Sequence, residues 1–142
     1  NKIKVSKSDV LFISDNIKSS LQEQYGNGNY WGYTDRDSFC FMMKHIEKIQ
    51  SNVRYVTIRL HPSENINSYS WAIKKYSPFV KVSYGKTLLD DLLNHNIVIG
   101  SDSMAMVIAV KCGKRVICSI PPSGKDCSLP LKEIEILKNI IL

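Results

Sequence analysis

Short unbroken runs of apolar residues recur along this chain, separated by longer stretches whose apolar positions recur every three or four residues. The runs are rich in β-branched residues and too short for helices, so they predict buried strands. We expect five strands, at residues 9–14, 53–60, 80–84, 97–100 and 115–120. Because most runs are continuous rather than alternating in polarity, both faces of the sheet should be covered.

The stretches between the strands predict helices. Apolar residues at helical spacing mark residues 35–50, 63–76 and 131–142, a leucine-rich helix follows the cap Thr87, and an apolar helix covers residues 103–111. Residues 15–34 are expected to form a polar connection and a loop rich in glycine and aromatic residues. This alternation predicts an α/β fold: a Rossmann-like, doubly wound, mostly parallel sheet of about five strands with helices on both faces.

The composition is that of an ordinary globular domain. Of the 142 residues, 44% are hydrophobic and 23% charged, and no apolar run approaches the roughly 18 residues that cross a bilayer. The chain begins at Asn1 without an initiator methionine, so we expect residues 1–142 to be a single domain cut from a longer protein. The net charge of +6 invites a nucleic-acid hypothesis, but the lysines are scattered and form no basic stripe.

Several reactive residue types give no recognisable site. The cysteines have no zinc-like spacing, so we expect free buried thiols and no metal; they are Cys40, Cys112, Cys118 and Cys127. Asp90 and Asp91 are adjacent, and neighbours on a helix diverge by about 100°. We therefore expect them on a solvated helix face rather than as a catalytic pair. His45 and His95 lack partners in the pattern and are expected to be structural.

The end of the second strand carries residues suited to a phosphate. His61 follows an apolar strand, and Pro62 ends that strand because proline has no ladder donor. Arg59 should share a face with His61 because side chains alternate along a strand. An imidazole can donate to a phosphate oxygen and offset the charge on a leaving phosphate, so His61 is our candidate catalytic residue.

The end of the fourth strand adds hydroxyls and free amides. Gly100 should permit close approach to a ligand, and Ser101 or Ser103 can present a hydroxyl while capping the next helix. Parallel strands end at one edge of a sheet, so both strand ends should meet in one crevice. Tyr84 and Gly85, after the third strand, are expected to flank a nucleobase through backbone contacts.

These motifs together resemble a known family. Strand-Arg-x-His-Pro, a short strand, a leucine-rich helix and strand-Gly-Ser-x-Ser before an apolar helix are similar to the C-terminal nucleotide-sugar-binding domain of bacterial GT-B glycosyltransferases with an HP motif. Within these, the chain looks most like the sialyltransferase and Kdo-transferase group, over residues 53–142. The resemblance implies that His61 contacts the phosphate of a CMP-sugar and assists its departure, while Ser101 and Ser103 bind the same phosphate.

The resemblance also implies a reaction. The enzyme would transfer a sugar, of sialic acid or Kdo type from a CMP donor, to a glycan acceptor in capsule or lipopolysaccharide synthesis. The catalytic base would come from a missing N-terminal domain, so this chain alone should be inactive. No cofactor or metal is expected, and the sugar nucleotide is a substrate, with CMP favoured over UDP. We expect a cytoplasmic location that allows peripheral contact with the inner membrane, and no nucleic-acid partner.

Two alternatives stay open. The same fold serves sugar-nucleotide epimerases and polyol-phosphate transferases, and a basic chain could be a noncatalytic binding module.

Overall fold

The computed structural model describes residues 9–83 and 86–142, and its core is a six-stranded sheet in the order β3-β2-β1-β4-β5-β6. All five strand pairings are parallel. The strands are β1 (Asp9–Ile13), β2 (Tyr55–Arg59), β3 (Val80–Ser83), β4 (Ile97–Gly100), β5 (Arg115–Cys118) and β6 (Glu135–Ile136). The predicted doubly wound α/β fold is confirmed, with one more strand than expected.

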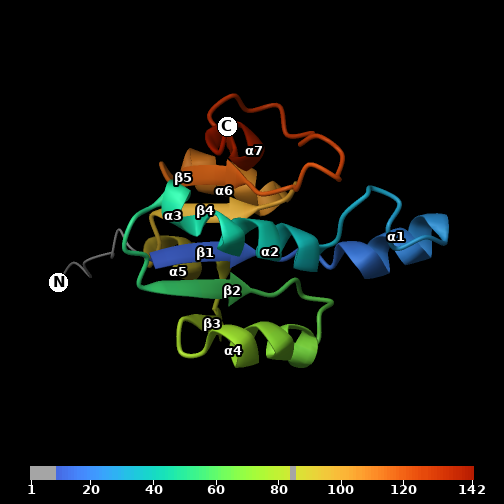
Figure 1. Cartoon of the computed structure of the whole chain (residues 1–142), viewed down its shortest axis with the longest axis horizontal. Helices are drawn as coiled ribbons and strands as arrows, with labels where there is room; N and C mark the ends of the chain where they lie inside the picture. Colours follow the sequence, from blue (N-terminus) through green and yellow to red (C-terminus); the bar gives the residue numbers. More distant parts are fainter. Residues whose placement is uncertain (1–8, 84–85) are drawn as a thin grey trace.

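Helices cover both faces of this sheet. They are α1 (Ile17–Tyr25), α2 (Asp35–Lys44), α3 (Ile46–Ile49), the 3₁₀ helix η1 (Ile66–Tyr69), α4 (Ser70–Tyr76), α5 (Leu88–Leu93), α6 (Met104–Lys111) and α7 (Leu137–Ile140). Helices α2, α3, α4 and α7 pack with Val10 and Phe12, whereas α1, α5 and α6 pack with Leu11 and Ile13. Neighbouring residues of β1 therefore belong to two separate apolar layers. Figure 1 shows α2 in front of β1, with β1 and β2 pointing in the same direction.

Three expected elements differ from the structure. Residues 17–25 form α1 instead of a polar connection, although only Ile17 and Leu21 of that helix are buried. The helix expected over residues 35–50 is interrupted at His45, which ends α2 and precedes α3. The segment 63–76 begins with η1, and its cap is Asn65, whose side chain accepts from the Asn67 amide at 2.8 Å.

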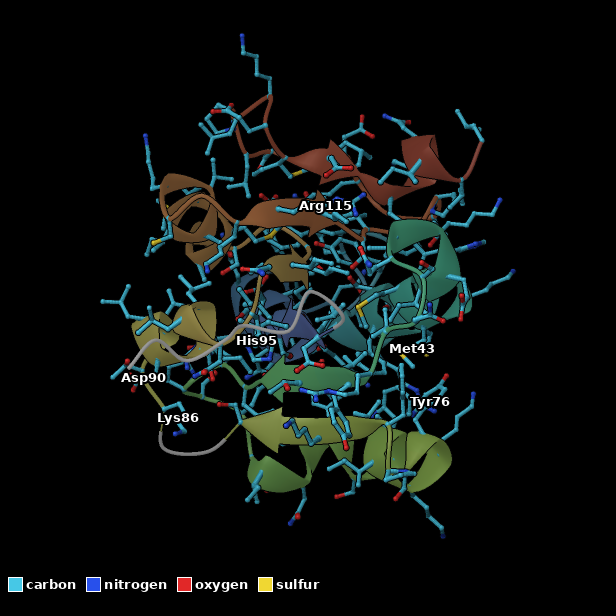
Figure 2. The ribbon with its side chains drawn as sticks, turned by 90° about the vertical axis from the view of Figure 1, so that its left-hand side faces the viewer. Met43, Tyr76, Lys86, Asp90, His95 and Arg115 are labelled. Carbon is cyan, nitrogen blue, oxygen red and sulfur yellow. The ribbon has the colours of Figure 1, made fainter. Side chains whose placement is uncertain are left out.

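The prediction of a helix over residues 131–142 is wrong. Glu135 and Ile136 instead extend the sheet as β6, and only Leu137–Ile140 is helical. The cause is a contact between distant residues, because the Arg115 guanidinium donates to both Glu135 carboxylate oxygens at 2.7 and 3.0 Å. Arg115 also donates to the Ile49 carbonyl oxygen at 2.6 Å. Figure 2 labels Arg115 on the side of the molecule where the strands begin.

The prediction of free, buried cysteines is confirmed in part. The cysteines are free, and Cys118 is buried, but Cys112 is exposed at the end of α6. Among the described residues, no helix is long and apolar enough to cross a membrane.

Candidate functional site

A small cavity opens where β1, β2 and β4 end. The chain runs outward from β1 to β2 and β3, then crosses back to place β4 on the other side of β1. Such a reversal leaves a crevice at the carboxyl ends of the strands, where doubly wound folds bind their ligands. The cavity measures about 160 Å³ and is lined by Ile13, Ser14, Asp15, Arg59, Leu60, His61, Pro62, Leu88, Ser103 and Ala105. The structure therefore brings Arg59, His61, Pro62 and Ser103 together, as the sequence predicts.

The His61 ring is held in a defined orientation. The Ser63 backbone N–H donates to Nδ1 at 3.1 Å, and the Ser63 hydroxyl lies 2.7 Å from the same nitrogen. Because Nδ1 accepts, the proton of the neutral ring lies on Nε2. Asn16 donates to the Ser63 hydroxyl at 2.9 Å, and the His61 backbone N–H donates to Glu64 Oε1 at 2.9 Å. His61 can therefore offer Nε2–H to a phosphate oxygen.

Arg59 lines the cavity but has a partner of its own. Its Nη1 donates to the Asp91 carboxylate and to the Lys86 carbonyl oxygen, each at 2.9 Å. Asp91 also accepts from the Ser83 hydroxyl and is 4% exposed. The prediction that Asp91 lies on a solvated helix face is therefore wrong, because the fold places the Arg59 guanidinium group of β2 against its carboxylate. The same prediction holds for Asp90, which is exposed and completes the capping box of α5 with Thr87.

The two serines after β4 have different environments. Ser103 caps α6 by accepting from the Ala105 amide at 3.1 Å, and its own hydroxyl hydrogen can be donated into the cavity. Ser101 is completely buried, and its hydroxyl donates to Ser38, which in turn contacts Ser119 at 2.7 Å. Only Ser103 of the two predicted hydroxyls therefore lines the cavity.

Gly100 serves the packing of α6 on the sheet. A Cβ at this position would lie 3.0 Å from Met106 Sδ and 3.4 Å from the Ile13 carbonyl oxygen. Protein atoms thus fill the space in which we expected a ligand. The absence of a side chain lets α6 approach β4 and β1 closely, which fixes where its N-terminus lies.

Asp102 anchors the turn between the two serines. It is bound by the Lys125 ammonium group and by the Ser128 hydroxyl at 2.6 Å. Burial opposes its ionisation, but the hydrogen bonds from Lys125 and Ser128 prevail and lower the pKa of Asp102. The Lys125 ammonium also lies 4.7 Å from the centre of the Trp31 ring. The segment that carries Lys125 and Ser128 thus holds the turn that carries Ser103, and Trp31 in turn contacts Lys125.

Two carboxyl groups near the cavity were not singled out by the sequence. Both Asp35 oxygens accept backbone amides, from Asp15 at 2.9 Å and from Ile17 at 2.7 Å, so Asp35 fixes the turn after β1. Burial raises the pKa of Asp35 to about 6. Burial and the neighbouring Asp35 raise the pKa of Asp15 to about 7, against hydrogen bonds from Ser103 and the Asp102 backbone. The available signal was position, since Asp15 follows a strand as His61 does.

The remaining predictions concern the nucleobase contacts, a structural histidine and a metal. Tyr84 and Gly85 lie outside the described residues. His95 is buried, and its Nδ1 lies 2.7 Å from the Asp91 carbonyl oxygen, as expected of a structural histidine. Figure 2 labels it on the side of the molecule where the strands begin. Within the described ranges, no group of three or more His, Cys, Asp or Glu side chains is placed to hold a metal ion.

Comparison with known proteins identifies a structural relative. No protein-family model matches the sequence, and no curated protein matches it significantly. Among solved structures, KpsC of Thermosulfurimonas dismutans, described as a beta Kdo 2,4 transferase, is similar with a TM-score of 0.55. This chain shares its fold with KpsC. The sequence identity is 20%, and the match covers 82% of this chain but 35% of KpsC, so the chain spans well under half of that protein.

The cavity suits a small anionic group. Whole ligands usually occupy about 300–1,000 Å³, so about 160 Å³ accommodates a phosphoryl group but not a nucleotide. His61 and Ser103 line it beside the start of α6, where the helix dipole favours negative charge, and the proton of the neutral His61 ring lies on Nε2.

Proposed function

We propose that this chain is the donor-nucleotide-binding domain of a glycosyltransferase. The observation that carries this proposal is the cavity in which His61 and Ser103 meet at the start of α6, although they lie 42 positions apart in the sequence. The fold shared with KpsC supports it.

In this proposal, each residue acts on the phosphate next to the sugar. His61 donates Nε2–H to a phosphate oxygen, and Ser103 donates its hydroxyl to another. When the bond between the anomeric carbon and the phosphate oxygen breaks, the electron pair stays on that oxygen, and both donors stabilise the added charge. Arg59 lines the cavity while its guanidinium group remains bound to Asp91, so in this proposal it shapes the wall of the site. Pro62 shapes the wall, and the buried Ser101 supports the turn through Ser38.

The rest of the reaction depends on groups outside this chain. We propose that a second domain supplies the base that deprotonates the acceptor hydroxyl, so that this chain binds nucleotide without transferring sugar. We favour a CMP donor carrying an acidic sugar, since KpsC is described as a Kdo transferase, and a glycan acceptor of the capsule or lipopolysaccharide type. No cofactor is proposed. The proposed setting is the cytoplasmic face of the inner membrane.

A thermal-shift panel tests the proposal. The chain is melted with CMP, UMP, UDP, CDP or CDP-glycerol, and with an oligonucleotide at two salt concentrations. At a hundred times its Kd, a ligand stabilises the folded state by about 2.7 kcal/mol, which raises the Tm of a chain of this size by about 9 °C. We expect CMP to give the largest rise and the oligonucleotide to give none.

Two histidine variants make the panel specific. His61→Ala should abolish the rise with CMP. His45→Ala is the matched control, because His45 ends α2 and contacts Phe41 away from the cavity, so it should keep the full rise. Protection by UDP or CDP-glycerol in place of CMP would favour the epimerase or polyol-phosphate transferase alternative. Strongly salt-dependent oligonucleotide binding without mononucleotide binding would overturn the proposal.

A further inference from the structure

Asp15 presents a puzzle within the proposed phosphate site. Its side chain lines the same cavity as His61 and Ser103, and it lies beside the Ser103 hydroxyl and the Asp102 backbone amide. These are the donors that an incoming phosphate needs. A carboxylate there would repel the phosphate and occupy a donor meant for it.

The surroundings of Asp15 decide which protonation state it can adopt. The charged and titratable groups around it come from several segments of the chain. They are Tyr33 before α2, Asp35 at the start of α2, Tyr69 of η1, Arg59 at the end of β2, His61 in the turn after β2, and Asp102 in the turn after β4. The Arg59 guanidinium group is bound to Asp91, and Lys125, which lies beyond Asp102, is bound to that carboxylate. Both carboxylate oxygens of Asp35 accept hydrogen bonds from neutral backbone amides, which do not cancel its negative charge next to Asp15.

We propose that Asp15 enters the bound state as a carboxylic acid and donates a hydrogen bond to the phosphate. This inference rests on the proposed function and names a further binding residue of the same site. One proton is taken from solvent for each phosphate bound by a chain whose Asp15 is ionised, and it is returned when the nucleotide leaves. A neutral carboxyl acting as a donor in an apolar, enclosed site is an established way to hold an oxyanion.

Because Asp15 is partly buried, protonating it near neutral pH requires little free energy. Its pKa of about 7 means that close to half of the unliganded molecules already carry the proton. A bound phosphate adds negative charge and raises the pKa of Asp15 further. Affinity should therefore be full well below pH 7 and fall above it, approaching tenfold per pH unit for one linked proton.

The test uses a ligand that does not titrate. Cytidine 5′-(methyl phosphate) is a phosphodiester whose single charge is constant from pH 5 to 9, unlike CMP, whose second phosphate pKa is about 6. Its Kd is measured by isothermal titration calorimetry from pH 5.5 to 8.5, in buffers of different ionisation enthalpy that report proton uptake. We expect at least a tenfold loss of affinity between pH 6.5 and 8.5, with net proton uptake at pH 7.5.

Asp15→Asn gives the discriminating result. The amide donates a hydrogen bond at every pH, so this variant should bind like the unmodified chain at pH 6 and at least tenfold more tightly than it at pH 8.5, without proton uptake at position 15. A purely structural role for Asp15 would not produce a gain in affinity. Asp126→Asn is the control, because Asp126 is 95% exposed and contacts only Lys138 through its carboxylate.

The outcomes separate this inference from the proposed function. If the diester binds but Asp15→Asn has the same pH profile as the unmodified chain, Asp15 is not the linked group and the inference fails while the site stands. If Asp15→Asn folds, as judged by its melting curve, but loses binding at every pH, the carboxylate form is required and the inference also fails. If neither CMP nor the diester binds at any pH, the proposed function itself fails.

Discussion

Replacing Asp91 with asparagine tests whether the Arg59–Asp91 ion pair holds one wall of the cavity. The Asp91 side chain is 6% exposed and that of Arg59 24% exposed, and the carboxylate also accepts from Ser83 at 2.8 and 3.0 Å. Removing one partner of a fully buried pair costs about 3–5 kcal/mol, because the other charge is left unpaired. Since Arg59 can regain part of its hydration, we expect the free energy of unfolding to fall by about 2–3 kcal/mol.

Urea unfolding followed by tryptophan fluorescence measures this change. The same loss corresponds to a Tm lower by about 7–10 °C for a domain of this size. Asp126→Asn removes an exposed ion pair and should stay within about 0.5 kcal/mol of the unmodified chain. The double variant Arg59→Met, Asp91→Leu removes both charges and should recover at least half of the loss. A loss below about 1 kcal/mol for Asp91→Asn would refute the reasoning, since the pair would then be effectively solvated.

Three further predictions concern thiol reactivity, glycine geometry and pH. The contact with Cys118 lowers the pKa of Cys127 below the ordinary thiol value. Alkylation of Cys127 by iodoacetamide, followed by peptide mass spectrometry, should therefore have a midpoint below about pH 8.5, and Cys118→Ala should raise that midpoint. An unchanged midpoint would contradict this reasoning. Gly32→Ala should lower the free energy of unfolding in urea by about 2–4 kcal/mol, because Gly32 has φ 78° and a Cβ would lie 2.4 Å from a backbone carbonyl oxygen. Gly113 has a similar φ of 77° but open space around it, so Gly113→Ala should lower that free energy by about 1 kcal/mol. Equal losses in the two variants would contradict the steric part of this argument. Because burial raises the pKa of Asp35 to about 6, its contribution to stability is complete below about pH 4 and is lost as the pH rises through 6. Asp15, whose pKa is raised to about 7, contributes to the same fall. Asp35→Asn should therefore reduce the fall in unfolding free energy between pH 4 and 6 without abolishing it, and an equally steep fall in the variant would show that Asp35 does not contribute.

The strands could be predicted because their signal is local. Each buried strand is a short apolar run, and β1 and β4 are buried along their whole length. The capping of α5 and α6 was equally local, since Thr87 and Ser103 bind amides two or three residues ahead. The crevice followed from topology, because parallel strands in this order must end together.

The errors occur where distant residues decide the outcome. The C-terminal segment has helical spacing, but its pairing with β5 depends on an ion pair between Arg115 and Glu135. Asp91 follows the pattern of a surface residue until Arg59 reaches it from β2. Helix α1 was missed because most of it faces solvent and its two buried residues give a weak periodic signal.

The chemistry of the site was predictable only in its outline. Residue types and strand ends placed His61 and Ser103 together, but the sequence could not tell that Ser101 turns toward Ser38. Asp15 could not be singled out from the sequence, because a lone carboxyl group after a strand belongs to no recognisable pattern. Its significance depends on burial and on the adjacent Asp35, which lies 20 positions away and contacts it only in the folded chain.

The central position of β1 has a consequence for how this polypeptide is synthesised. Phe12 of β1 is in register with Ile58 on one side and Ile99 on the other. During synthesis, the segment that contains His61 therefore leaves the ribosome well before the segment that contains Ser103. During that interval, β1 can pair with β2 on one side, but its other edge lacks β4. Unpaired strand edges template aggregation. We expect truncated or stalled chains that end before β4 to aggregate through β1 and to depend on chaperones.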